Sequence, residues 1–205
     1  MAEIKFYTNP RSRGRMIRWM LEEVGADYDP VYLEYGSMNS EEYRRINPMA
    51  KVPAIVHDGN IVTECAAICA YLADSFPDAG LAPAPDARAD YYRWLFFAAG
   101  PLESAIVNQA LGVELKAEQK GFVGYGDMDR VLDTLEAAVG QHTFITGSTF
   151  SAADVYLGAQ LNFGLQFGTV EKRKTFEDYV QRATDREAFR KAAALDDAVL
   201  AQASD

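Results

Sequence analysis

The spacing of apolar residues changes about a third of the way along the chain. Up to about residue 77, short alternating or continuous apolar runs typical of strands lie between runs with helical spacing. We expect strands at 4–8, 28–33, 52–56 and 60–62, and helices at about 12–24, 41–46 and 64–76. The resulting β-α-β-α-β-β-α order predicts an α/β domain with a mixed sheet and helices packed on it.

Signals at the ends of these elements support the assignment. Gly25 follows the apolar pattern of the first helix and is expected to end it. Ser40 and the acidic residues after it are typical of a helix start. Asp58-Gly59 lies between two apolar runs and predicts a two-residue hairpin turn.

The rest of the chain has a different pattern. Residues 78–87 are rich in Pro, Ala, Gly and Asp and are expected to form a linker. Beyond it we expect only helices, at 89–109, 116–122, 128–139, 152–165, 172–183 and 186–201. Ser151-Ala152-Ala153-Asp154 predicts a capping box at one of them. The chain is therefore expected to hold an α/β domain (1–77), a linker (78–87) and an all-helical C-terminal domain (88–205).

Composition and charge narrow the functional classes. The chain has 205 residues and a formal net charge of −10, and such an acidic surface repels nucleic acid. No apolar run is long enough to span a membrane, and the first residues do not form a secretory signal, so we expect a cytoplasmic location. Cys65 and Cys69 do not suggest a disulfide framework. With only two histidines and no zinc-ligand spacing, we expect no metal.

Four arginines form a local exception to the acidic composition. Arg11, Arg13, Arg15 and Arg18 fall within a span of eight residues that follows the first expected strand. They are compatible with a helix start whose arginines pair with acids, for example Arg18 with Glu22 one turn later. They are equally compatible with an anion-binding site. The sequence leaves both interpretations open.

Four short motifs, in this order and spacing, resemble the glutathione S-transferase family. They are Phe6-Tyr7-Thr8-Asn9-Pro10-Arg11-Ser12-Arg13, Ile46-Asn47-Pro48-Met49-Ala50-Lys51-Val52-Pro53, Thr63-Glu64-Cys65-Ala66-Ala67-Ile68 and Ser151-Ala152-Ala153-Asp154. The resemblance covers nearly the whole chain and is densest over residues 4–77. It implies a thioredoxin-like first domain, glutathione as co-substrate, and a homodimer in which the first domain of one chain faces the second domain of the other.

The resemblance also implies a glutathione-binding site. Pro53 would follow a cis peptide bond and expose the backbone of Val52 to the cysteinyl part of glutathione, with Lys51 beside it. Glu64 would bind the γ-glutamyl amino group, and the backbone N–H of Cys65 would bind the neighbouring carboxylate. The family usually has serine after this glutamate. Cysteine is a weaker donor, so we expect the backbone contact to be kept and the side-chain contact to be weakened.

Two residues are candidates for activating the glutathione thiol. In the resembled family a Tyr at the end of the first strand, or a Ser or Cys at the start of the first helix, donates a hydrogen bond to the thiolate. Both Tyr7 and Ser12 lie at spacings that match one of the family's types. We favour Ser12, because Arg11 and Arg13 flank it and its hydroxyl and N–H can face one anion. Tyr7 as a packed strand residue and Ser12 as a plain helix cap remain the structural alternatives.

The second substrate is expected between the domains. Tyr92, Phe96 and Phe163 are our candidates for an apolar pocket, which would take a small apolar electrophile. Aromatic residues at helical spacing also commonly pack in a core. Two other functions fit the same fold: a glutathione-dependent reductase or peroxidase in which a thiol such as Cys65 is the nucleophile, and a non-catalytic module that binds glutathione.

Overall fold

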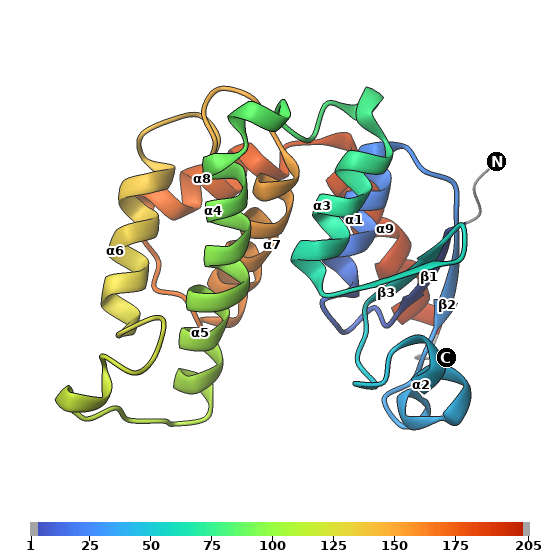
Figure 1. Ribbon diagram of the computed structural model, residues 1–205, viewed down its shortest axis with the longest axis horizontal. Coiled ribbons are helices and arrows are strands. Elements are labelled where there is room, and N and C mark those ends of the chain that lie inside the picture. Colours follow the sequence, from blue (N-terminus) through green and yellow to red (C-terminus); the bar gives the residue numbers. More distant parts are fainter. Residues whose placement is uncertain (1–3, 203–205) are drawn as a thin grey trace. The chain divides into compact units, whose positions relative to one another are not determined.

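The computed structural model describes residues 4–202, which form two compact units. The first unit runs to Leu81 and resumes at Asp185, and the second runs from Ala82 to Thr184. The change from one unit to the next therefore falls within the expected linker. The last helix, which we expected in the second domain, belongs instead to the first unit (Figure 1).

The first unit is built on a four-stranded sheet. Its elements are β1 Ile4–Thr8, α1 Gly14–Val24, β2 Tyr28–Tyr32, α2 Glu41–Ile46, β3 Ala54–His57, β4 Asn60–Thr63, α3 Cys65–Ser75 and α9 Glu187–Gln202. The strand order is β2-β1-β3-β4, with β1 parallel to β2 and antiparallel to β3, and β3 antiparallel to β4. The predicted order of elements and the mixed sheet are confirmed.

Alternation along β1 sorts its side chains between the two faces of the sheet. Ile4, Phe6 and Thr8 are completely buried, and α1 packs on β1 and lies side by side with α3 and α9 (Figure 1). Tyr7 points to the opposite face, where its ring meets Tyr43 of α2 at a centroid distance of 5.5 Å. A side chain of α2 therefore contacts the face of the sheet opposite α1.

The predicted ends of several elements are confirmed. Gly25 ends α1 in the left-handed conformation at φ 65°, and Ser40 accepts a hydrogen bond from the N–H of Tyr43 at the start of α2. Asp58 and Gly59 both have positive φ, as a two-residue hairpin turn requires. β3 begins at Ala54 instead of the expected residue 52, so Val52 and Pro53 precede the paired part of the strand.

The second unit is helical within the described residues. It contains α4 Ala89–Phe97, α5 Glu103–Ala110, α6 Met128–Val139, α7 Ala152–Phe167 and α8 Lys174–Thr184. At the start of α7, the buried carboxylate of Asp154 accepts hydrogen bonds from the N–H groups of Ser151 and Ile145 and from the hydroxyls of Ser151 and Tyr179. The predicted capping box is confirmed, and it ties α7 to α8 and to the preceding loop.

Two expected helices of this unit differ from the structure. The expected helix at 89–109 is interrupted by a π-helical segment, Ala98–Leu102, which contains Pro101. Because proline has no N–H, it cannot continue the α-helical hydrogen-bond pattern. The expected helix at 116–122 is wrong: only a 3₁₀ turn at Ala117–Gln119 forms, in a polar, exposed segment without an apolar face to bury.

Candidate functional site

The turn after β1 is built around Asn9, which is 3 % exposed. Its side-chain oxygen accepts a hydrogen bond from the N–H of Arg11 at 2.8 Å, and its side-chain nitrogen donates to the carbonyl of Leu33 at 2.9 Å. Tyr35 adds a second link between the same two loops, because its hydroxyl donates to the carbonyl of Arg11 at 3.1 Å. The sequence Asn-Pro predicted a turn here, and the side chain of Asn9 fixes it to the loop that follows β2.

Ser12 lies at the end of this turn, just before α1. Its hydroxyl donates to the carbonyl of Asn9 at 2.7 Å and accepts from the N–H of Gly14 at 2.9 Å. The N–H of Ser12 also donates to the carbonyl of Asn9, at 3.0 Å. Ser12 is thus paired with the N–H of Gly14, the first residue of α1, and lies half-buried at the positive end of the α1 dipole, while Arg13 is the N-cap.

Tyr7 has a different environment. It is half-buried on the face of the sheet opposite α1, and its ring contacts Tyr43 of α2. Burial raises the pKa of the Tyr43 phenol to about 12, so Tyr43 stays protonated and remains a donor. Tyr7 and Ser12 therefore lie on different parts of the same unit, one on a sheet face and the other at a helix start.

The four arginines after β1 divide into two pairs. Arg11 and Arg13 are exposed and flank Ser12. Arg15 and Arg18 turn toward α9, where Arg15 contacts Asp197 at 2.6 Å and Arg18 contacts Asp196 at 2.9 Å. The suggested pairing of Arg18 with Glu22 is therefore wrong. The interpretation that the arginines pair with acids therefore holds for Arg15 and Arg18. The anion-binding interpretation stays a prediction.

The segment Lys51-Val52-Pro53 is anchored from α2. The peptide bond between Val52 and Pro53 is cis, as expected. The carbonyl of Lys51 accepts hydrogen bonds from the hydroxyl of Tyr43 at 2.6 Å and from the side-chain nitrogen of Asn47 at 2.8 Å. Both donors are almost fully buried, at 2 % and 4 % exposed. They hold the backbone on one side of Val52, while the Lys51 side chain is exposed.

Glu64 joins β4 to α3 in an unusual backbone conformation. Its φ of 66° and ψ of 119° are rarely adopted by residues other than glycine. The side chain is exposed at the start of α3, and Cys65 is the first residue of that helix. Non-glycine residues at positive φ cluster at functional sites, because the surrounding structure has to enforce them.

The two cysteines lie on the buried side of α3. Cys65 is 9 % exposed and Cys69 is completely buried, and neither forms a disulfide. Burial raises the pKa of the Cys69 thiol well above its ordinary value, with a smaller contribution from Cys65. Cys69 is therefore a neutral core residue. The described residues contain no cluster of His, Cys, Asp or Glu that could hold a metal ion.

The candidate second-substrate residues all lie in the second unit. Tyr92 and Phe96 are 43 % and 70 % exposed on α4, which is unusual for large aromatic side chains. Phe163 on α7 is half-buried, and its ring lies 6.1 Å from that of Phe167. Tyr92 also accepts a hydrogen bond from Arg88 at 3.2 Å. The candidate residues therefore consist of two exposed aromatic side chains on α4 and one half-buried aromatic side chain on α7.

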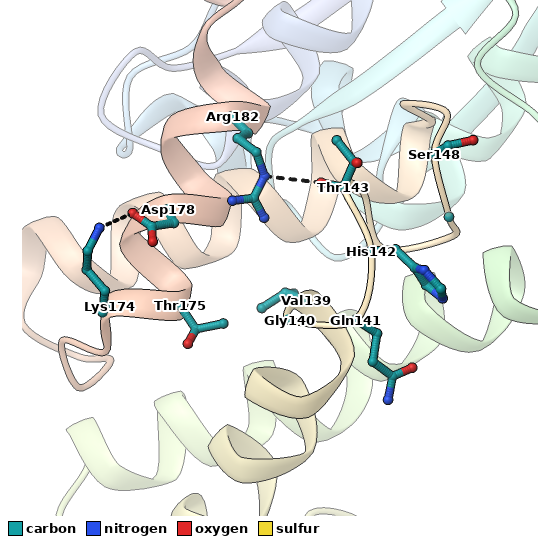
Figure 2. A pocket seen from close by; sticks show the side chains of 11 residues that line it. Val139, Gly140, Gln141, His142, Thr143, Ser148, Lys174, Thr175, Asp178 and Arg182 are labelled. Carbon is teal, nitrogen blue, oxygen red and sulfur yellow. Dashed lines mark hydrogen bonds and ion pairs between the residues drawn. The ribbon is translucent and has the colours of Figure 1, made fainter.

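The second unit also has a polar hollow of about 700 Å³ between the end of α6 and α8 (Figure 2). Arg182 points toward its middle and donates to the carbonyl of Thr143 at 3.3 Å, and Lys174 is paired with Asp178. None of the residues expected to bind glutathione or a second substrate lines it. Because its lining is polar, it does not match the expected apolar pocket.

Sequence reasoning missed several residues that shape the site. Asn9 and Tyr43 carry the hydrogen bonds that fix the turn and the Lys51 segment. Asn9 has a usable signal, since Asn before proline favours a side-chain-stabilised turn. Tyr43 has none, because its role depends on a carbonyl eight residues away.

Within residues 4–202, every helix is too short or too polar to cross a lipid bilayer.

The first unit is a thioredoxin-like domain, and it is followed by a helical unit. The sequence matches the family described as glutathione S-transferase, N-terminal domain, over residues 2–74. It is also similar to glutathione S-transferase hmp2 of Hypomyces subiculosus, at 30 % identity with 93 % of this chain and 98 % of the relative covered. The chain belongs to the glutathione S-transferase family.

Solved structures agree with this assignment. A sphingomonad glutathione S-transferase complexed with glutathione matches at a TM-score of 0.76 and 26 % identity, covering 94 % of this chain and 98 % of that one. The glutathione transferase of Methylococcus capsulatus strain Bath matches at a TM-score of 0.78 and 25 % identity, with the same shares covered. The family and the thioredoxin-like fold are therefore both established.

Proposed function

We propose that this protein is a glutathione transferase that binds glutathione on its first unit and activates the thiol through Ser12. The observation that carries the proposal is the position of the Ser12 hydroxyl at the start of α1, between the exposed Arg11 and Arg13. A free thiol has a pKa near 8.5, so only a few per cent is ionised at neutral pH. A hydroxyl donor at the positive end of a helix stabilises the thiolate and lowers that pKa.

The remaining glutathione contacts come from two backbone segments. Val52, next to the cis-proline, supports strand-like pairing with the cysteinyl part of glutathione, with Lys51 beside it. Glu64 would hold the γ-glutamyl amino group, and the N–H of Cys65 would hold the carboxylate at the start of α3. The exposure of the Glu64 side chain supports this role, since an amino group from solvent can reach it.

Tyr7 is the alternative donor. Its contact with the Tyr43 ring supports a packing role on the α2 face of the sheet, whereas Ser12 lies beside two exposed cations. A thiolate is stabilised by positive potential, so the Ser12 position fits the chemistry better. We therefore retain Ser12 as the activating residue and treat Tyr7 as the comparison in any test.

The second substrate in this proposal is a small apolar electrophile. Tyr92 and Phe96 support it, because they expose large aromatic surface on α4, and Phe163 adds part of a ring on α7. We also propose a homodimer in the cytoplasm, as the family resemblance implies. Light scattering of the purified protein would test the dimer by giving twice the chain mass.

A second candidate function uses the thiol of Cys65. Cys65 is the first residue of α3, where a helix N-terminus favours a thiolate, and this observation supports a glutathione-dependent reductase or peroxidase. Its exposure of only 9 % speaks against direct attack on a large substrate. A non-catalytic glutathione-binding module is the third possibility on the same fold.

One sequence of assays separates these functions. The protein is applied to immobilised glutathione, eluted, and assayed with glutathione plus either an activated aryl halide or a hydroperoxide. We expect retention and turnover of the aryl halide, with unchanged turnover in Cys65→Ala. Turnover of the hydroperoxide alone, lost in Cys65→Ala, would favour the second candidate. Retention on the glutathione column without either activity would favour the non-catalytic binding module. Failure of the protein to bind the column would contradict all three functions.

A further inference from the structure

Thr8, the last residue of β1, has a buried hydroxyl whose role the fold leaves unexplained. The residue is completely buried, and among residues 4–202 its Oγ1 has no hydrogen-bond partner. Most buried side-chain hydroxyls are paired, because a buried polar group without a partner destabilises the folded state. The fold therefore gives this hydroxyl no structural role, and a functional role has to be considered.

The Thr8 hydroxyl lies beside the start of α1, close to Ser12. A Cβ placed on Gly14 would lie 2.0 Å from Oγ1 of Thr8 and 3.1 Å from Oγ of Ser12, so the two oxygens are no more than about 5 Å apart. Only the absence of a side chain at Gly14 allows this approach. Because a side-chain rotation moves a hydroxyl oxygen by about 2–3 Å, a direct hydrogen bond between the two is within reach.

The hydrogen bonds of Ser12 leave room for such a contact. A hydroxyl has one proton and two lone pairs. At Ser12 the proton is directed to the carbonyl of Asn9, and one lone pair accepts from the N–H of Gly14. When the proton is turned to a thiolate, the carbonyl of Asn9 still accepts from the N–H of Ser12 at 3.0 Å. Rotation of the Ser12 hydroxyl therefore leaves no buried group without a partner. The second lone pair of the Ser12 oxygen is available to accept another hydrogen bond.

We propose that Thr8 is a positioning residue for Ser12: its hydroxyl donates to Oγ of Ser12 when Ser12 donates to the glutathione thiolate. The inference rests on the proposed function of Ser12. The resulting chain runs from the Thr8 hydroxyl to the Ser12 hydroxyl to the thiolate sulfur. The only bond broken is S–H, and its proton leaves to solvent. A hydroxyl that accepts a hydrogen bond becomes a stronger donor, so the chain lowers the pKa of the bound thiol further.

The test uses a matched pair of variants. Thr8→Val keeps the shape of the side chain and removes the hydroxyl, whereas Thr8→Ser keeps the hydroxyl and removes a methyl group. The pKa of enzyme-bound glutathione is measured by ultraviolet titration of the thiolate and by the pH profile of kcat/KM. We expect Thr8→Val to raise this pKa by about half a unit, a roughly threefold fall in the ratio of thiolate to thiol at a given pH. We expect Thr8→Ser to match the wild type, and Thr8→Val to have no further effect in a Ser12→Ala background.

Stability measurements separate positioning from packing. Removing an unpaired buried hydroxyl is expected to leave the urea midpoint unchanged or to raise it. If Thr8→Val does not fold, Thr8→Ala replaces it, because alanine also lacks the hydroxyl and needs no extra space. Three results would each overturn the inference. The thiol pKa could be unchanged in the Val or Ala variant, it could shift equally in the Ser variant, or the shift could persist without the Ser12 hydroxyl. If the wild type does not bind glutathione, both the proposed function and the inference are overturned. If the wild type lowers the pKa of bound glutathione and Thr8→Val has the same thiol pKa, only the inference is overturned.

Discussion

At the scale of single residues, Glu64 shows how local conformation and chemistry are combined. Its φ of 66° costs about 1–3 kcal/mol for a residue with a Cβ, and glycine would adopt it with less strain. A position selected for stability alone would favour glycine. The presence of glutamate here is consistent with a requirement for its carboxylate, which the proposed function supplies.

Three substitutions of Glu64 separate its two properties. Glu64→Ala has the same backbone constraint but no carboxylate, and we expect glutathione affinity to fall by about tenfold or more, since a charge-assisted hydrogen bond is lost. Glu64→Gly should lose the same affinity while its free energy of unfolding rises by about 1 kcal/mol. Calorimetric titration with glutathione and urea unfolding measure the two quantities. Glu64→Gln is the control, because it keeps the size of the side chain and removes its charge. An unchanged glutathione affinity in Glu64→Ala would show that Glu64 is not part of the binding site.

Residues differ in how far the sequence alone could define them. The cis bond before Pro53 and the helix-starting position of Cys65 follow from motifs and are seen in the structure. The unpaired hydroxyl of Thr8 and its distance from Ser12 could not be predicted, because they depend on how closely α1 approaches the end of β1. That approach depends on Gly14, whose importance is visible only once its neighbours are known.

At the scale of elements, α1 and α9 form an antiparallel pair joined by charges. The Arg18 guanidinium is 2 % exposed; it donates to Asp196 of α9 and, at 3.1 and 3.0 Å, to the hydroxyls of Tyr28 and Tyr32 at the two ends of β2. Burial disfavours its charged form, but Asp196 and Tyr28 outweigh burial and raise the pKa of Arg18. Nearer the other end of the pair, Arg186 binds Glu23 through two hydrogen bonds of 2.6 and 2.7 Å.

The buried pair predicts a clear difference between neighbouring acids. Asp196→Asn leaves the Arg18 charge buried without its anion, and we expect a loss of about 3 kcal/mol in the free energy of unfolding. The matched control is Asp197→Asn, because Asp197 also pairs with an arginine of α1 but its side chain is 65 % exposed. There we expect a change of less than about 1 kcal/mol. Urea unfolding of both variants measures the difference, and equal losses would mean that burial of the pair is unimportant.

Elements were predicted well wherever their signals are local. Helix α6 has the predicted bounds, and the four strands are placed within two residues at each end. The expected helix at 116–122 failed because helical spacing over a few polar residues does not supply a face to bury. The docking of α9 on α1 could not be predicted, since the pattern of a helix shows which face is apolar but not which element covers it.

At the scale of the whole molecule, a protein with a net charge of −10 exposes two arginines beside the residue that the proposed chemistry uses. Arg11 and Arg13 are exposed on either side of Ser12. Sequence motifs were sufficient to indicate the family and the thioredoxin-like first unit. They were not sufficient to choose between Ser12 and Tyr7, because the choice depends on the direction of side chains in the folded unit.

The central claim is that Ser12 ionises glutathione, and the pKa of the enzyme-bound thiol tests it most directly. The thiolate is titrated by ultraviolet absorbance in the wild type, in Ser12→Ala and in Tyr7→Phe, at saturating glutathione. We predict that Ser12→Ala raises the bound thiol pKa toward about 8.5, the ordinary value, and lowers kcat accordingly, while Tyr7→Phe leaves both near the wild-type values. An unchanged pKa in Ser12→Ala, with the shift appearing in Tyr7→Phe, would contradict the account and make Tyr7 the activating residue.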